Sequence, residues 1–180
     1  MTQTSKKKKI ALIIAFRDFR DEEYFEPKEV LEKAGFEITT VSEKMGSAMG
    51  VYGGEAEINL LLSELKVHDF DAVVFVGGSG ASRYFEDKSA RRIVLETVLE
   101  NKVLGAICIA PTILALAGVL KNKKATVWSS NMDKSFVEIL KKEGADYSVP
   151  SAVVVDGLII TANGPEAATA FAQAVVDKLK

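Results

Sequence analysis

The stretch of residues 103–118 restricts the possible fold of this chain more than any other segment. It opens as a short apolar run, typical of a buried strand, and continues without a linker as a helix. Pro111 suits the first turn of that helix, and Gly118 suits its C-terminal end. The only cysteine of the chain, Cys108, therefore lies where a strand must turn into a helix, which is how nucleophile elbows present their side chain.

Two interpretations of Cys108 follow from this position. The amide groups at a helix N-terminus favour a thiolate, so the first interpretation is a reactive thiol with a lowered pKa. In the second, Cys108 is an inert core residue, because a single cysteine in an apolar segment usually packs as a small hydrophobic side chain. The stretch itself leaves both open.

The order of the other segments predicts an α/β fold. Helices separate most of the buried strands, which are expected at residues 10–16, 36–41, 71–76, 103–107 and 125–128. Asp156-Gly157 between two apolar runs predicts a β-hairpin in the C-terminal half, and a last helix is expected from about Pro165. Strands that alternate with helices, without repeats or a linker, indicate a mostly parallel sheet between layers of helices.

Length and composition fit one globular domain. The chain has 180 residues, 48% of them hydrophobic, and we expect a single domain over residues 10–180 behind a disordered lysine-rich tail at residues 1–9. The formal net charge of −2 argues against a role on nucleic acid or at a membrane surface. One cysteine excludes an intrachain disulfide and fits a reducing cytoplasm, and one cysteine with one histidine predicts no metal site.

Glycines follow the strand predicted at residues 71–76. In a parallel sheet the functional site lies at the carboxyl ends of the strands, so the run Gly77-Gly78-Ser79-Gly80 is placed to supply backbone amides that stabilise an oxyanion. The run lacks the third glycine of a dinucleotide fingerprint and the lysine of a phosphate loop. We therefore expect no bound cofactor.

One carboxyl group stands apart from the acidic cluster that follows the first strand. Most acids of that cluster belong to a solvated helix face, whereas Glu23 shares the core-facing stripe with Pro27 and Leu31. Burial raises the pKa of a carboxyl group, so Glu23 is a candidate to share a proton with a thiol. A histidine partner is improbable, because the only histidine, His68, precedes residues 71–76 and belongs at the opposite end of the sheet.

In their order and spacing, several segments resemble the DJ-1/PfpI superfamily over nearly the whole chain. The resemblance is carried by Glu23 four residues before Pro27 and by residues 71–78, 106–111, 118–121 and 156–165. It implies a flavodoxin-like three-layer α/β/α sandwich, with Cys108 as elbow nucleophile and Glu23 as its protonated partner. It also implies that the chain forms a homodimer or a larger homo-oligomer, and that the site includes the backbone amides of Gly77, Gly78 and Ile109.

Two positions depart from the family pattern. The peptidase branch has a histidine directly after the elbow cysteine, where this chain has Ile109. The DJ-1 branch has a histidine on the strand after the elbow helix, and the matching position here is Trp128. The resemblance therefore leaves a dyad of Cys108 and Glu23, and we expect Trp128 and Phe16 to line the pocket.

Three functions are compatible with such a dyad. In the first, the Cys108 thiolate adds to a small reactive carbonyl, or to its adduct on a protein, while Glu23 transfers the proton. The second is an intracellular cysteine peptidase, which is less favoured because Ile109 cannot protonate an amine leaving group. The third is a non-enzymatic stress sensor or chaperone in which Cys108 is oxidised to a sulfinic acid.

Overall fold

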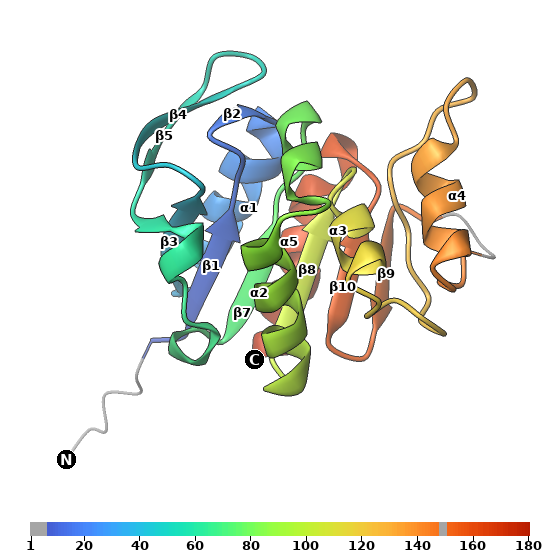
Figure 1. Ribbon diagram of the computed structural model, residues 1–180. Coiled ribbons are helices and arrows are strands. Elements are labelled where there is room, and N and C mark those ends of the chain that lie inside the picture. The colour runs from blue at the N-terminus through green and yellow to red at the C-terminus, as the bar shows by residue number, and fades with distance from the viewer. Residues whose placement is uncertain (1–6, 148–150) are drawn as a thin grey trace.

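The structure is a computed structural model that describes residues 7–147 and 151–180, and it is built around a seven-stranded sheet (Figure 1). The strand order is β6-β3-β1-β7-β8-β10-β9, and all neighbours are parallel except β10 and β9. The strands of this sheet are β1 (Lys9–Ile13), β3 (Glu37–Ser42), β6 (Leu60–Leu61), β7 (Ala72–Phe75), β8 (Val103–Ile107), β9 (Val153–Asp156) and β10 (Ile159–Ala162).

Helices cover both faces of the sheet. In Figure 1, α2 and α3 lie on one face with α4 beside α3, while α1 and α5 pack against each other on the other face. The helices are α1 (Asp21–Lys33), α2 (Lys88–Leu99), α3 (Pro111–Leu116), α4 (Ser135–Lys142) and α5 (Ala168–Leu179). The predicted flavodoxin-like α/β/α sandwich is therefore confirmed.

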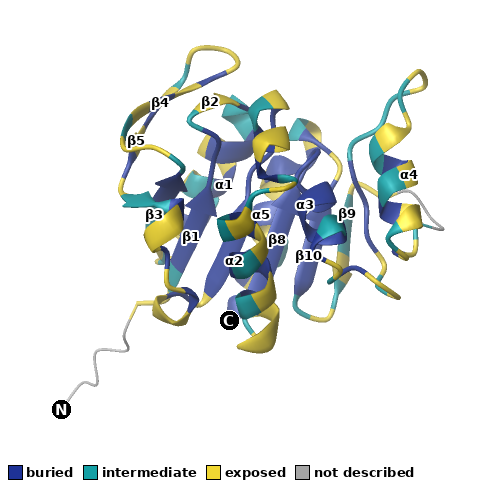
Figure 2. Ribbon diagram, viewed as in Figure 1, coloured by how far each residue is buried: buried dark blue, intermediate teal, exposed yellow. Residues whose placement is uncertain are grey.

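Alternation along the central strands creates two apolar cores. Ala11 and Ile13 of β1 point to the α2 and α3 side, whereas Ile10 and Leu12 point to the α1 and α5 side. Both faces of the strand are covered, so its buried residues, 10–13, are all apolar, as is typical of parallel sheets. Figure 2 shows the central strands β1, β7, β8 and β10 as a buried layer, with exposed residues on the outer faces of the helices.

Gly105, in the middle of β8, leaves room for a neighbouring side chain. A Cβ atom at this position would lie 2.9 Å from Cζ of Phe171 and 3.1 Å from Cγ2 of Val74. The missing side chain lets the fully buried Phe171 ring of α5 approach the middle of the sheet. The last helix is thereby held behind the strand that carries Cys108.

A small second sheet lies beside the carboxyl end of β1. It has the order β2-β4-β5 and consists of β2 (Arg17–Phe19), β4 (Gly46–Gly50) and β5 (Glu55–Ile58). The Asp21 carboxylate accepts the backbone N–H groups of Tyr52 (2.8 Å) and Gly54 (2.7 Å), which fixes the turn between β4 and β5 to the start of α1. The antiparallel strands β4 and β5 thus form a hairpin held against the start of α1.

The structure corrects two boundaries drawn from the sequence. No strand forms at residues 125–128, where the pattern predicted one; the chain there makes a single bridge, between Lys124 and Asp146, and then runs irregularly. Residues 1–6 of the predicted tail lie outside the described residues, but Lys9 already belongs to β1, and the side chain of Lys8 donates to the carbonyl of Leu179.

Candidate active site

Cys108 lies on a tight turn between β8 and α3. Its backbone has a φ of +63°, a left-handed conformation that residues with a side chain rarely adopt. The turn is held from both sides, because the Cys108 N–H donates to Ala162 O (2.9 Å) and the Cys108 carbonyl accepts the N–H of Trp128 (2.8 Å). A strained residue fixed in this way at the end of a sheet has the geometry of a nucleophile elbow.

The strain at the elbow predicts an unusual order of stabilities. Glycine adopts positive φ without a steric cost, so Cys108→Gly is expected to be more stable than Cys108→Ala by about 1 kcal/mol in urea unfolding. The control pair is wild type against Ala106→Gly, on the preceding strand β8, where φ is not positive and glycine should destabilise. Equal stability of the two Cys108 variants would show that the elbow stores no strain.

Glu23 reaches the elbow from the first turn of α1. The start of this helix is fastened to the end of β7, because the N–H of Arg20 donates to Gly77 O (3.0 Å). Glu23 is fully buried, as its place on the core-facing stripe predicted. Neither of its carboxyl oxygens makes a well-formed hydrogen bond with a described residue; the groups that approach it are the Cys108 thiol and the Gly77 amide.

Burial determines the protonation of this pair. Desolvation raises the pKa of the Glu23 carboxyl to about 7, against the opposing effects of the Cys108 thiol and the Arg20 charge. Burial, followed by the negative charge of Glu23, raises the pKa of the Cys108 thiol to about 12, and the amides of Gly78 and Ile109 offset only part of this. Of the two sequence-based interpretations of Cys108, the direction of this shift disfavours the one with a lowered thiol pKa. The helix that could lower the thiol pKa, α3, has only six residues.

The backbone amides at the elbow have separate neighbours. Those of Gly78 and Ile109 lie against the sulfur, whereas that of Gly77 lies against the Glu23 carboxyl. No side chain fits at Gly77, because a Cβ there would come within 2.4 Å of Cβ of Cys108 and 2.6 Å of Oε2 of Glu23. The glycine is what allows thiol and carboxyl to approach each other.

A cavity of about 550 Å³ opens above the sulfur and the carboxyl group. Cys108 and Glu23 form its polar floor, and the cavity size is typical of small-molecule sites. Its lining also includes Arg20, Val51, Gly78, Ser79, Ser82, Ile109, Trp128, Phe136 and Pro165. A reactive group of a small molecule could therefore reach both members of the pair.

Sequence reasoning assigned the walls of this cavity only in part. Trp128 lines it, but Phe16 does not: the Phe16 ring lies beneath Lys44, whose Nζ is 5.0 Å from the ring centroid, so the expectation that Phe16 lines the pocket is corrected. Phe136 and Arg20 were missed. No local pattern marks Phe136, since α4 brings it to the cavity from a distant part of the chain.

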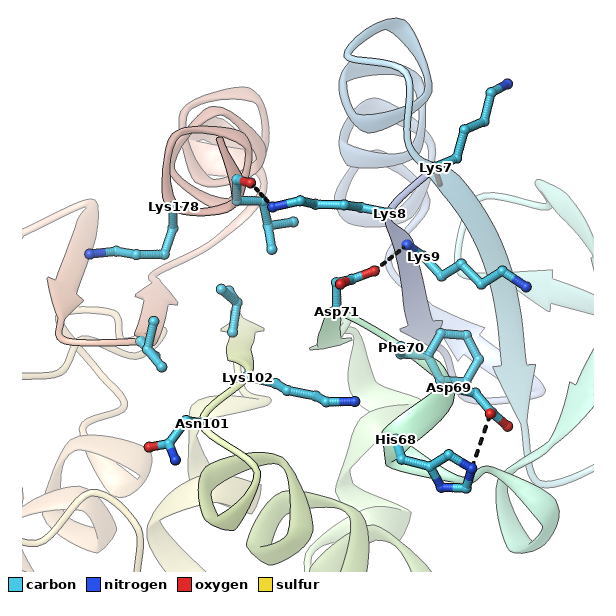
Figure 3. A pocket seen from close by; sticks show the side chains of 13 residues that line it. Lys7, Lys8, Lys9, His68, Asp69, Phe70, Asp71, Asn101, Lys102 and Lys178 are labelled. Atoms are coloured by element: carbon cyan, nitrogen blue, oxygen red, sulfur yellow. Dashed lines mark hydrogen bonds and ion pairs between the residues drawn. The ribbon is translucent and has the colours of Figure 1, made fainter. Parts of the chain in front are cut away.

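A second hollow, of about 450 Å³, lies at the other end of the parallel strands, near their amino ends (Figure 3). It contains His68, which is exposed and pairs with Asp69 (3.1 Å), at the amino end of β7 as the sequence predicted. Several lysines line it, but Nζ of Lys102 already donates a hydrogen bond to Val67 O (2.7 Å), and no cysteine lines the hollow. It therefore offers no nucleophilic thiol.

Among residues 7–147 and 151–180, no three His, Cys, Asp or Glu side chains lie close enough together to hold a metal ion. No helix in the same ranges is long and apolar enough to cross a membrane.

The fold and the elbow define a class: a flavodoxin-like α/β protein that carries a cysteine at a nucleophile elbow beside a buried glutamate. The model of the DJ-1/PfpI family matches residues 8–178, nearly the whole chain. The chain belongs to the DJ-1/PfpI family.

Individual relatives agree with this assignment. The chain is 38% identical to an uncharacterized protein of Methanocaldococcus jannaschii over 99% of its own length and 85% of the relative. It is 30% identical to the deglycase PfpI of Pyrococcus furiosus, covering 94% of this chain and 98% of that one. A ThiJ/PfpI domain protein from Brachyspira murdochii has a similar crystal structure, with a TM-score of 0.90 at 34% identity over 97% of this chain and 98% of that chain.

Proposed function

We propose that this protein is a cysteine-dependent enzyme that converts small α-oxoaldehydes, or their adducts on proteins, through a dyad of Cys108 and Glu23. The observation that carries the proposal is the elbow thiol beside a fully buried carboxyl group that lacks a well-formed hydrogen bond and faces a cavity. A relative named as a deglycase supports the same class of substrate.

The first step is addition of the thiol to the aldehyde. Sγ of Cys108 bonds to the aldehyde carbon while its proton passes to the Glu23 carboxylate, and the π electron pair moves to the oxygen. The amides of Gly78 and Ile109 lie close enough to the sulfur to stabilise this oxyanion. Glu23 then returns the proton to the oxygen, which leaves a neutral hemithioacetal.

The second step needs no external oxidant. Glu23 removes the C–H proton of the hemithioacetal and returns it to the neighbouring carbonyl carbon, while the hydroxyl proton moves to the neighbouring oxygen. One carbon is oxidised and the other is reduced, which gives a thioester. Water then cleaves the C–S bond and releases a 2-hydroxy acid and the free thiol.

The pH dependence of the rate tests the role of Glu23. Because the carboxylate form accepts the thiol proton, we expect kcat/KM for methylglyoxal to rise about tenfold per pH unit below the Glu23 pKa of about 7 and to level off above it. Loss of the dicarbonyl and formation of lactate are followed from pH 5 to 9. A rate that falls as pH rises through 7 would contradict the proposal.

Controls separate this reaction from the alternatives. Cys108→Ala should reduce turnover to background. Methylglyoxal in amine-free buffer without protein should give no lactate. Casein cleavage by the wild type without dicarbonyl loss would replace the proposal with a peptidase. Addition of about two oxygens to Cys108 by dilute peroxide, with no turnover of methylglyoxal, would replace it with a redox sensor.

The assembly of this chain into a homodimer or a larger homo-oligomer, which the family resemblance implies, remains a prediction.

A further inference from the structure

The cavity above Cys108 has two chemically different halves. The floor and rim are polar, with the dyad, Arg20 and two serines, while one wall is apolar and aromatic. That wall is formed mainly by Trp128 and Phe136, with Ile109 next to the sulfur. The reaction of a dicarbonyl group uses the dyad and the backbone amides of Gly78 and Ile109, so the rings of Trp128 and Phe136 have no role in the chemistry described above.

The aromatic wall is a built surface rather than a chance contact. The rings of Trp128 and Phe136 meet edge to face, with centroids 6.1 Å apart, and Phe136 meets Phe85 in the same manner at 6.1 Å. Trp128 is also fixed relative to the nucleophile, because its backbone N–H donates to the carbonyl of Cys108 (2.8 Å). The indole is only partly buried and turns part of its surface to the cavity.

Size and polarity indicate what the wall receives. A cavity of about 550 Å³ is far larger than a dicarbonyl group requires. An aromatic substituent placed against Trp128 and Phe136 would extend the edge-to-face arrangement and bury apolar surface on both sides. Arg20, the cation that lines the cavity, is paired with Glu22 (2.8 Å), so it offers little to an anionic substituent.

We infer that the wall of Trp128 and Phe136 is a specificity subsite for an aromatic substituent, so that the preferred substrates are aryl-substituted α-oxoaldehydes. The turnover part of this inference rests on the proposed function, whereas the binding part does not. We expect wild-type kcat/KM for phenylglyoxal to exceed that for methylglyoxal by about tenfold, which corresponds to about 1.4 kcal/mol.

Substitutions at the wall test the subsite through this ratio. Trp128→Ala is expected to bring the phenylglyoxal-to-methylglyoxal ratio close to one, whereas Trp128→Phe keeps a ring in place and should retain most of it. Met132→Ala, at a fully exposed side chain near α4, serves as a matched control and should leave the ratio at its wild-type value. A wild-type ratio near one, or a ratio unaffected by Trp128→Ala in a folded protein, would overturn the inference.

Binding without turnover provides a separate measurement. The chain has a single tryptophan, so the indole N–H of Trp128 gives one signal in an NMR spectrum. In the Cys108→Ala protein, acetophenone should shift this signal saturably, with a Kd at least about tenfold below that of acetone. Equal effects of the two ketones would overturn the subsite. Saturable acetophenone binding by Cys108→Ala, together with a wild-type protein that turns over no dicarbonyl, would refute the proposed function and support the subsite.

Discussion

Replacing Glu23 by Gln is expected to lower the turnover of α-oxoaldehydes by about 10²–10⁴-fold, the usual contribution of a positioned general acid or base. Gln has almost the same shape but cannot accept the proton of the Cys108 thiol. The inflection of the rate near pH 7 should disappear with it, because Glu23 is the group with that pKa in the cavity. Glu29→Gln, an exposed position on the same helix, should leave both rate and pH profile at wild-type values.

Glu23 is also expected to make the wild-type fold less stable as pH rises, while the catalytic rate increases. Glu23→Gln should remove this pH dependence of stability. Folding raises the pKa of Glu23 from 4.5 to about 7, so its neutral form stabilises the fold fully below pH 4.5 and this contribution is lost as pH rises through 7. Relative to Glu23→Gln, the wild type should therefore lose about 3 kcal/mol of unfolding free energy between pH 4.5 and pH 8.

Urea unfolding of the two proteins at both pH values measures this difference. Other titrating groups are shared, so their contributions cancel in the comparison. The thiol of Cys108 titrates above the range used, because its pKa is raised to about 12. A constant difference between the two proteins across this pH range would mean that Glu23 is charged at no cost, and the buried acid could not then act as described.

Gly77→Ala is expected to damage stability and activity together. The added methyl carbon would lie 2.4 Å from Cβ of Cys108, 2.6 Å from Oε2 of Glu23 and 2.8 Å from the carbonyl oxygen of Ile107. Two of these neighbours are rigid, so the elbow or the start of α1 must move. We expect a loss of about 1–3 kcal/mol in unfolding free energy, and a loss of activity of about 10²-fold from misplacement of the dyad.

Gly35→Ala distinguishes this steric effect from an ordinary glycine effect. Gly35 has a φ of +92°, and a Cβ there meets nothing within 4 Å, so this variant has a backbone cost without a clash and lies outside the cavity. It should lose stability while its catalytic rate stays at the wild-type value. Wild-type activity in Gly77→Ala would show that thiol and carboxyl do not depend on their close approach.

Local patterns in the sequence were enough to locate the two groups of the proposed dyad. Cys108 lies between an apolar strand and a proline-initiated helix, and Glu23 lies on the buried stripe of an amphipathic helix, so each position has a signal within a few residues. The alternation of strands and helices likewise predicted the parallel sheet. The strand predicted at residues 125–128 does not form. This short apolar run packs in the core, and only its neighbour Lys124 makes a bridge, to Asp146.

The protonation of the pair and the shape of its pocket depend on tertiary structure. From the sequence alone, a lowered thiol pKa and an inert core cysteine were both open, whereas burial beside the Glu23 charge raises the thiol pKa, because desolvation depends on everything packed around the sulfur. The aromatic wall likewise combines Trp128 with Phe136 of α4, and Phe16 turns away toward Lys44. Spacing along a chain determines which face of its own helix or strand a side chain occupies, but the distances between elements are set only when those elements pack.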